Sequence, residues 1–267
     1  MNPARAVQAA RALLSPAVFL PWSRRWGVRL WILAVLALAW GLWNAFFVAP
    51  GDAAQGEVYR PLSLPVPAAW LSMFVYLVMA LHCAAGWIWN TRVSWALARG
   101  LAPVGAGYTA VALLTGSLWG QPTWGTWWVW DARLTSELLL LLLYFGVMVL
   151  QSSFEDRERG RRAAGLLAVV GVVNLPVIYF SVAWWNTLHQ GATLSPSQGA
   201  QLAPAMLHAL LAMTAAAWCH AAGSGLLRAH LVLRAEGRRE GQFAQSRGDA
   251  PLANLLPASG SSELSAP

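Results

Sequence analysis

Long apolar runs alternate with polar connections along the whole chain, and this alternation predicts its fold. The runs lie at about residues 27–48, 66–90, 100–118, 134–152, 163–181 and 204–228. A run of roughly 20 apolar residues is long enough for one helix to cross the hydrocarbon core of a bilayer. The pattern therefore predicts an all-α, polytopic membrane protein with six transmembrane helices.

The connections between the runs are of two kinds. Three are longer, at 49–65, 119–133 and 182–203, whereas those at 91–99 and 153–162 are short and charged. The chain is therefore expected to have three parts: an N-terminal segment at 1–26, a membrane domain at 27–230 and a tail at 231–267. After about residue 240 the tail is rich in Ser, Gly, Pro and Ala, a composition typical of disorder.

The placement of positive charge predicts the orientation of the helices. All 18 basic residues are arginine, and they gather in or near the N-terminal segment, the two short connections and the tail. Only Arg60 and Arg133 fall in the longer connections. Because arginine concentrates on the cytoplasmic side of membrane proteins, we expect both termini to be cytoplasmic and the longer connections to be external. In a Gram-negative bacterium this arrangement means the inner membrane, with these connections in the periplasm.

Composition excludes several classes of protein. The chain is 57% hydrophobic and 11% charged, whereas about a quarter of the residues of a soluble domain are charged. The net charge of +7 follows the membrane topology, so no nucleic-acid partner is expected. The sequence contains no Walker A, HExxH or GxSxG motif, so neither nucleotide hydrolysis nor other hydrolase chemistry is expected of this chain.

The segment WGQPTWGTWWVWDARLTSE at 119–137 stands out between two aliphatic runs. It contains five tryptophans: Trp119, Trp124, Trp127, Trp128 and Trp130. Tryptophan is enriched where the membrane meets water, because its ring is apolar and its indole N–H needs a partner. Five rings exceed what anchoring requires, so the segment predicts a flat apolar surface for a large planar ligand.

A second aromatic cluster lies beside a histidine in the last long connection. Trp184 and Trp185 precede His189, in the stretch SVAWWNTLHQG. An imidazole next to a planar aromatic surface suits an iron porphyrin, which needs an axial nitrogen and apolar contacts. A histidine in a loop is also commonly just solvated. No CxxCH motif occurs, so a porphyrin would be bound without a covalent link.

Charged residues near the tryptophans have two interpretations each. Arg60 and Arg133 could each hold a carboxylate such as a haem propionate, or Arg133 could pair locally with Asp131 or Glu137. Asp131 stands where a helix begins, so it is either an ordinary N-cap or part of the site. Glu137 lies deeper in the apolar run, where a carboxylate needs a partner or a wet cavity.

Two histidine–cysteine pairs lie in the predicted spans. His82–Cys83 and Cys219–His220 are expected at similar depth, so a metal site between them is conceivable. Small polar residues that are satisfied by helix packing are far more common.

These motifs resemble one family closely. WGTWWVWDARLTSELLLLLLYFG is similar to the tryptophan-rich WWD signature of haem-handling proteins in cytochrome c maturation. GVVNLPVIYFSVAWWNTLHQG, GSLWGQPTWG and VPAAWLSM match the CcmC-type proteins of that group in order and spacing, over roughly residues 27–230. The resemblance implies six spans, an external haem site whose floor is the WWD segment, and one axial histidine from each flanking loop.

The resemblance also implies roles for single residues. The floor corresponds to the five tryptophans and Asp131, the external arginines to Arg60 and Arg133, and one axial ligand to His189. The family's other axial histidine precedes VPAAW, where this chain has Pro65, which has no donor atom. His208, water or a partner residue could then provide the sixth ligand. Ala183 stands where the family often has an acid.

The resemblance implies haem b as the bound group and a set of partners. CcmC-type proteins present haem to the chaperone CcmE and associate with the ATPase CcmA and the membrane subunits CcmB and CcmD. A second hypothesis is a permease subunit that moves haem or another substrate through the helix bundle with the help of a separate ATPase. A conduit should place polar groups along several spans, and the first, third and fifth are nearly bare of them. A purely structural role would leave the tryptophans without a ligand.

Overall fold

The computed structural model describes residues 15–51, 56–185, 194–195, 199–200 and 203–246. Within these residues, six helices are long and apolar enough to cross a membrane, which confirms the predicted fold class. The chain divides after Leu233 into a first unit, which holds the helix bundle, and a second unit that contains the end of the last helix.

The first three spans are formed by α2, α3 and α4. Helix α2 (Pro16–Trp43) ends in the π-helical turn η1 (Asn44–Val48). The 3-10 helix η2 (Glu57–Ser63) leads into α3 (Pro65–Trp89), and α4 (Arg92–Trp124) follows after a short turn.

The other spans are formed by α5, by α6 with α7, and by α8. Their bounds are α5 (Ala132–Ser153), α6 (Arg157–Val170), α7 (Asn174–Trp184) and α8 (Pro204–Ser246). The two-residue strands β1 (Leu194–Ser195) and β2 (Gly199–Ala200) pair antiparallel before α8.

The fifth span is interrupted. The sequence predicts one helix at 163–181, whereas the 3-10 turn η3 (Gly171–Val173) separates α6 from α7. Pro176 lies in the first turn of α7. Because proline has no N–H to bond the carbonyl of Val172, a continuous α-helix loses a hydrogen bond at this point.

The charged connection predicted at 91–99 is helical, so this boundary is wrong. Asn90 closes α3 with φ 46°, and α4 begins at Arg92. Arg92 and Arg99 are exposed whereas Val93 is buried, so the charges lie on the outer face of a continuous helix. The polar residues at this end of the span belong to the helix and do not mark its boundary.

The outer helices are also longer than predicted. Helix α2 begins at Pro16, where proline fits the first helical turn because the N–H it lacks would be unbonded there. Helix α8 continues to Ser246, through the first part of the tail expected at 231–267 and past residue 240, after which composition predicts disorder. Leu, Ala, Arg and Glu dominate its last turns, and all four are good helix formers.

The core of the bundle lies between α3, α4, α5 and the α6–α7 pair. Tyr76 of α3 and Tyr144 of α5 are fully buried and meet edge to face, with ring centroids 5.0 Å apart. Gly105 of α4 lies against the phenol end of Tyr144, and Gly171 against that of Tyr76. Glycine at these two positions leaves room for the rings.

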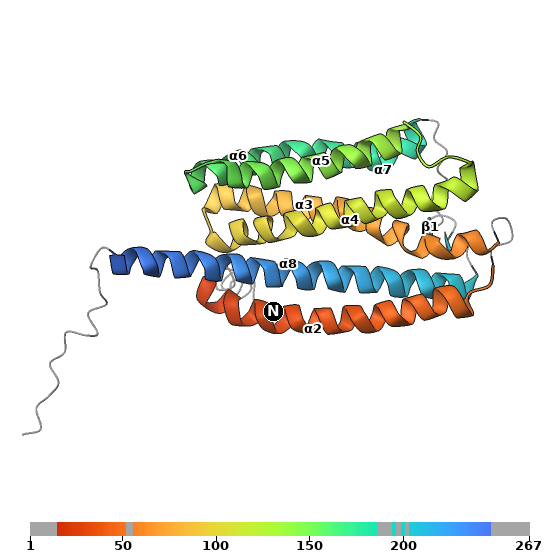
Figure 1. Cartoon of the computed structure of the whole chain (residues 1–267), viewed down its shortest axis with the longest axis horizontal. Helices are drawn as coiled ribbons and strands as arrows, with labels where there is room; N and C mark the ends of the chain where they lie inside the picture. The colour runs from red at the N-terminus through yellow and green to blue at the C-terminus, as the bar shows by residue number, and fades with distance from the viewer. Residues whose placement is uncertain (1–14, 52–55, 186–193, 196–198, 201–202, 247–267) are drawn as a thin grey trace, which may run out of the picture. The chain divides into compact units, whose positions relative to one another are not determined.

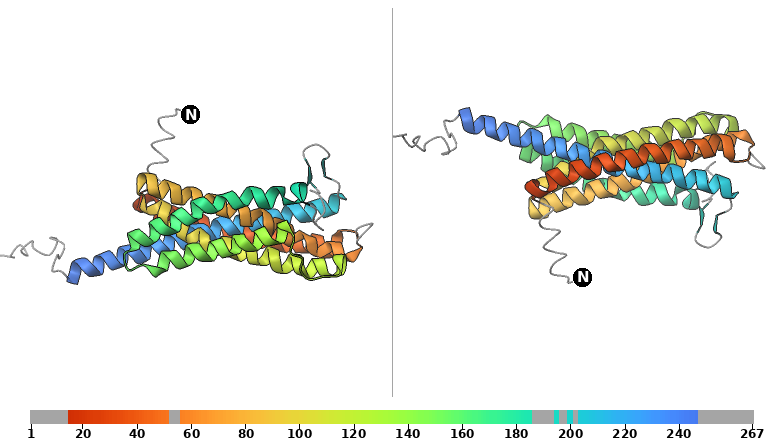
Figure 2. Two further views of the ribbon diagram at one scale, coloured as in Figure 1. Left: turned by 90° about the horizontal axis from the view of Figure 1, so that it is seen from above. Right: turned by 90° about the horizontal axis from the view of Figure 1, so that it is seen from below.

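The helices of the first unit form layers (Figure 1). Helices α5, α6 and α7 lie on one side of α3 and α4, and α2 lies on the other side with the part of α8 up to Leu233. Helices α2 and α8 approach closely at small residues, because a Cβ at Gly223 would lie 3.0 Å from the carbonyl oxygen of Gly27. The ends of α2, α4 and α7 lie at one end of this unit, opposite the α3–α4 and α5–α6 turns (Figure 2).

Candidate functional site

The tryptophan segment begins inside helix α4 rather than in a loop. Trp119 and Trp124 lie in the last turns of α4, edge to face, with ring centroids 5.0 Å apart. Trp119 is buried, so this ring is not part of the exposed surface that the sequence predicts. Gly125 ends the helix with φ 76°, a conformation that glycine adopts without strain.

The other three tryptophans follow in a non-helical stretch. Trp127 and Trp130 are 58% and 75% exposed, and Trp128 is half-buried. The rings of Trp128 and Trp130 meet edge to face at 5.4 Å. The hydroxyl of Thr126 donates a hydrogen bond to the carbonyl oxygen of Trp128 at 3.0 Å, which fixes the turn. The Thr126 hydrogen bond therefore fixes a backbone turn that exposes large aromatic rings.

Asp131 ends this stretch as the N-cap of α5. Its Oδ1 accepts a hydrogen bond from the backbone N–H of Leu134 at 2.7 Å. The capping role expected from the sequence is therefore present. A shorter side chain such as alanine would leave this N–H without its acceptor, so Asp131 also fixes the point at which the tryptophan stretch stops.

Arg133 connects the tryptophan stretch to the second aromatic cluster. Its Nη1 donates to the carbonyl oxygen of Ile178 in α7 at 3.3 Å. At the end of α7, Phe180 stacks on Trp184 with centroids 5.1 Å apart, and Trp185 meets Trp184 edge to face at 5.7 Å. Both tryptophans are exposed. The start of α5 and the aromatic end of α7 are thus at the same end of the bundle.

Glu137 lies one turn further into α5 and is 4% exposed. Its Oε1 accepts a hydrogen bond of 2.6 Å from the hydroxyl of Ser72 in α3, while Oε2 has no hydrogen-bond partner among the described residues. Tyr144 donates to the carbonyl oxygen of Ser72 at 2.8 Å, and Asn174 of α7 donates to that of Ser136 at 2.9 Å. These bonds hold α3, α5 and α7 together below the tryptophans.

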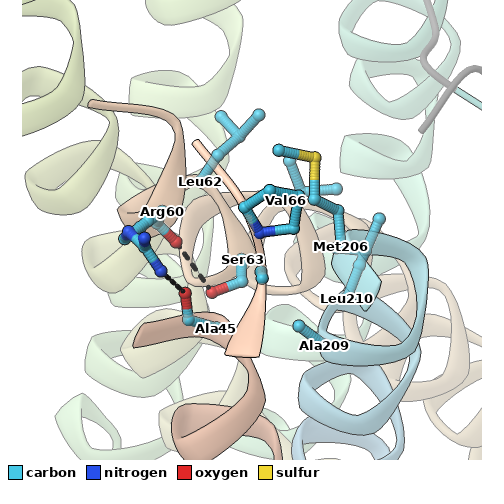
Figure 3. Close-up of a pocket in the computed structure, with 10 residues that line it drawn as sticks. Ala45, Arg60, Leu62, Ser63, Val66, Met206, Ala209 and Leu210 are labelled. Atoms are coloured by element: carbon cyan, nitrogen blue, oxygen red, sulfur yellow. Dashed lines mark hydrogen bonds between the residues drawn. The ribbon is translucent and has the colours of Figure 1, made fainter. Parts of the chain in front are cut away.

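Arg60 is occupied by partners within the chain (Figure 3). Its Nη1 donates to the carbonyl oxygen of Ala45 at 3.1 Å, as Figure 3 shows, and also to that of Phe46 at 3.0 Å. These carbonyls belong to the last turn of the first span, where helical acceptors lack intrahelical donors. Glu57 forms an ion pair with the same guanidinium group. Arg60 therefore caps the end of the first span.

The cavity beside Arg60 is small. It is bordered by η1, η2 and the start of α8, with Val66, Met206 and Leu210 on its apolar side (Figure 3). Its volume is about 20 Å³, which suits one water molecule rather than a macrocycle. A large planar ligand therefore does not fit into this cavity.

The Glu57–Arg60 ion pair should survive acidification through the range in which an ordinary glutamate becomes protonated. The hydrogen bond from Arg60, helped by its charge, lowers the pKa of Glu57 from its ordinary value of 4.5. A pKa lowered by folding gives a stabilisation that is complete above the unfolded value and is lost as the pH falls through the folded value. The difference in apparent melting temperature between the parent and Glu57→Gln should therefore be constant above pH 4.5. Below that pH, the two melting temperatures should converge.

The measurement is thermal unfolding in detergent at a series of pH values. Glu155→Gln, which changes an exposed acid in the turn between α5 and α6, is the matched control. Convergence of the parent and Glu57→Gln already above pH 4.5 would contradict the ion pair.

The predicted histidine positions have different outcomes. His189 lies outside the described residues, so its place relative to the tryptophans stays a prediction. His208 is exposed near the start of α8. Pro65 is the first residue of α3 and is buried, in a position that favours proline because its missing N–H is not needed there.

The conceivable metal site between the two histidine–cysteine pairs is not formed. The ring nitrogens of His220 lie 2.8 Å from the hydroxyl of Tyr108 and 3.2 Å from that of Ser224. No group of three or more His, Cys, Asp or Glu side chains with metal-binding geometry occurs among the described residues. His220 is therefore engaged in helix packing.

Two contacts of the site were not predicted. The pairing of Ser72 with Glu137 joins residues 65 positions apart and has no local signal. The pairing of Arg60 with Glu57 does have one, because a three-residue spacing places opposite charges on the same side of a helical turn.

In the described part of the chain, six apolar helices and an exposed, tryptophan-rich segment between α4 and α5 define a polytopic membrane protein of the WWD class. The sequence model described as Heme exporter protein C (CcmC) matches residues 9–243. The chain therefore belongs to the Heme exporter protein C family, which confirms the resemblance.

Individual relatives agree with this assignment. Heme exporter protein C of Escherichia coli K12 is 50% identical over 175 residues, or 66% of this chain and 69% of the relative. The protein of the same name from Bradyrhizobium diazoefficiens is 46% identical over 206 residues, or 76% and 77% of the two chains. A putative cytochrome c biosynthesis ccmC-like mitochondrial protein of Marchantia polymorpha is 39% identical over 187 residues, or 68% and 78%.

Proposed function

We propose that this protein binds haem at the periplasmic face of the bacterial inner membrane and delivers it to the chaperone CcmE during cytochrome c maturation. The cargo is haem b, bound without a covalent link to this chain. The protein acts in an ABC-type complex with the ATPase CcmA and the membrane subunits CcmB and CcmD. Membership of the Heme exporter protein C family supports the haem-handling role.

The single observation that carries the proposal is the outward presentation of large aromatic rings beside a cation. Trp127 and Trp130 are exposed on a stretch held by Thr126 and Asp131, and Arg133 follows at the start of α5. A porphyrin has a broad apolar face and two carboxylates, so it needs this combination of aromatic rings and guanidinium groups.

The proposed orientation follows from arginine placement on the helices. Arg92 and Arg99 lie in the first turns of α4, and Arg157 begins α6. These positions are at the end of the bundle opposite the tryptophan stretch (Figure 2). With arginine on the cytoplasmic side, the tryptophans face the periplasm.

The residues divide into three roles in this proposal. The aromatic floor consists of Trp119, Trp124, Trp127, Trp128, Trp130, Trp184 and Trp185, with the buried Trp119 supporting the outer rings from below. Arg133 and Arg60 pair with the propionates, Asp131 fixes the end of the floor, and His189 is the axial ligand of the iron. Because Pro65 cannot ligate, the sixth position is filled weakly, with the exposed His208 as one source.

The buried polar groups favour presentation at the surface over transport through the bundle. Hydrogen bonds between helices involve the side chains of Ser72, Glu137, Tyr144 and Asn174. A conduit would need such groups to line a wet path through the membrane. Here they join α3, α5 and α7 instead.

Removing the exposed rings tests the proposal. A chain with both Trp127→Ala and Trp130→Ala should lose most of the haem that co-purifies with the parent, by roughly tenfold or more, because each ring contributes apolar contact area. The measurement is the Soret absorbance per protein after purification in detergent.

The matched control is Trp89→Ala, which removes an equally exposed tryptophan at the other end of the bundle. This variant should keep the haem content of the parent. Equal haem in the double variant and the parent would exclude the tryptophan stretch as the binding surface.

A further inference from the structure

A second group of polar side chains lies far from the tryptophan segment, between α2, α4 and α8. Tyr108 of α4 donates to the carbonyl oxygen of Ala217 at 2.9 Å, and its oxygen lies 2.8 Å from Nδ1 of His220. Nε2 of His220 lies 3.2 Å from the hydroxyl of Ser224, which accepts a bond from the indole N–H of Trp31 at 3.1 Å. Four side chains from three helices thus form one continuous chain of hydrogen bonds.

Every member of this chain of hydrogen bonds has a partner. With the single proton of Tyr108 on the Ala217 carbonyl, Nδ1 of His220 carries a hydrogen and donates to the tyrosine oxygen. Nε2 is then an acceptor for the hydroxyl of Ser224. The rings of Trp31 and His220 also meet edge to face at 4.8 Å. The network therefore holds these rings in one arrangement without a ligand.

The held rings border an open groove. It has a volume of about 540 Å³, and its lining includes Trp31, Gly107, Tyr108, His220 and Arg228. A Cβ added at Gly107 would meet nothing within 4 Å, so this glycine leaves the floor open. Volumes of 300–1,000 Å³ are typical of small-molecule sites.

One end of the groove carries a cation. Arg228 is exposed and makes no hydrogen bond or ion pair with any other described residue. It lies two turns beyond His220 in α8, or about 12 Å along the helix axis at 1.5 Å per residue. The lining also includes the apolar residues Val104, Val111 and Leu227. The groove therefore combines a cationic group with an apolar body.

We propose that this groove is a binding site for an acidic amphiphile, with its anionic head on Arg228 and its apolar body against Trp31, Tyr108 and the floor at Gly107. Two sources share this chemistry: an anionic phospholipid of the membrane, and a porphyrin with carboxylates. The site is separate from the tryptophan segment and does not depend on the function proposed for it.

The lipid arm uses the full chain in nanodiscs that contain phosphatidylglycerol and phosphatidylcholine, analysed by native mass spectrometry. The parent should retain phosphatidylglycerol selectively. Gly107→Leu, which fills the floor, and Arg228→Gln, which removes the cation, should each reduce this retention by roughly tenfold, since a charge-assisted hydrogen bond is lost or blocked. Gly116→Leu and Arg99→Gln are the controls. Gly116 has free space at its Cβ, as Gly107 does, and Arg99 is an exposed arginine of α4.

The porphyrin arm uses titration with hemin in the His189→Ala chain. This variant removes the iron ligand proposed for the tryptophan segment, so that ligation there does not contribute to the measured binding. Selective loss of hemin binding in Gly107→Leu and Arg228→Gln would identify a porphyrin as the ligand. If neither probe binds the parent, or if the controls lose binding as much as the two groove variants, the proposal is overturned. Arg228→Gln changes an exposed side chain, so its result does not depend on whether Gly107→Leu folds.

Discussion

A chain that carries Pro65→His is expected to bind haem with a six-coordinate, low-spin spectrum and to retain it at least tenfold better than the parent. The sequence motif VPAAW is preceded by histidine in the family that the chain resembles, and here by Pro65. A second imidazole would complete the axial ligation that His189 begins under the proposed function. The measurement is an optical spectrum of the purified variant in both oxidation states.

The backbone at this position should tolerate the substitution. Pro65 is the first residue of α3, where an N–H group needs no helical acceptor. The loss of the fixed proline φ angle costs about 0.4–1 kcal/mol of folding free energy, which is small beside a new metal bond. Because Pro65 is buried, the imidazole must turn toward the end of the bundle to reach a ligand on the tryptophans.

Two comparison variants make this result interpretable. Pro61→His adds the same imidazole to an exposed position of η2 and should leave the spectrum of the parent unchanged. Adding His189→Ala to Pro65→His should return the spectrum to a single axial imidazole. A spectrum of Pro65→His identical to that of the parent would mean that position 65 is not the family's axial position.

The largest effect on stability is expected from Gly105→Ala. A Cβ at this position would overlap the phenol end of Tyr144. Tyr144 is fully buried and donates its hydrogen bond to the carbonyl oxygen of Ser72 at 2.8 Å, so its ring has no free space to move into. Overpacking of this kind costs typically 1–3 kcal/mol, and we expect a loss of about 2–3 kcal/mol here.

Gly107→Ala is the matched control, two residues away on the same helix. A Cβ there meets nothing within 4 Å, and alanine is the better helix former by about 1 kcal/mol. The control should therefore be as stable as the parent or slightly more stable. Thermal unfolding monitored by size exclusion in detergent distinguishes the two variants, and equal melting temperatures for them would contradict the packing of Tyr144 against α4.

The apolar runs predict the fold because every backbone N–H and C=O group in a bilayer must be hydrogen-bonded within the protein. Few structures other than a helix meet this requirement. They do not predict the helix ends. Arg92 and Arg99 lie within α4 because long cationic side chains on an outer face can reach the polar boundary while the helix continues. The interruption at η3 has a local cause, Pro176, but composition alone reads the fifth span as one helix.

The sequence predicts where the tryptophan segment lies in the chain but not its internal arrangement. Clustered tryptophans indicate a surface, yet Trp119 is buried and Trp130 is exposed although both belong to one motif. That difference depends on where α4 ends, which Gly125 determines through its backbone conformation. The partner of Glu137 is Ser72 on another helix, and only the folded arrangement brings the two together.

The contacts of Arg60 have a consequence for how firmly an external acid can be held. Its guanidinium group already serves Glu57 and the two carbonyls at the end of the first span. The carboxylate of a ligand must displace Glu57 from the guanidinium group. The net gain in binding free energy is then the difference between two similar ion pairs, and not the full free energy of one. Such an exchange favours a shallow, easily reversed association, which suits the delivery step of the proposed function.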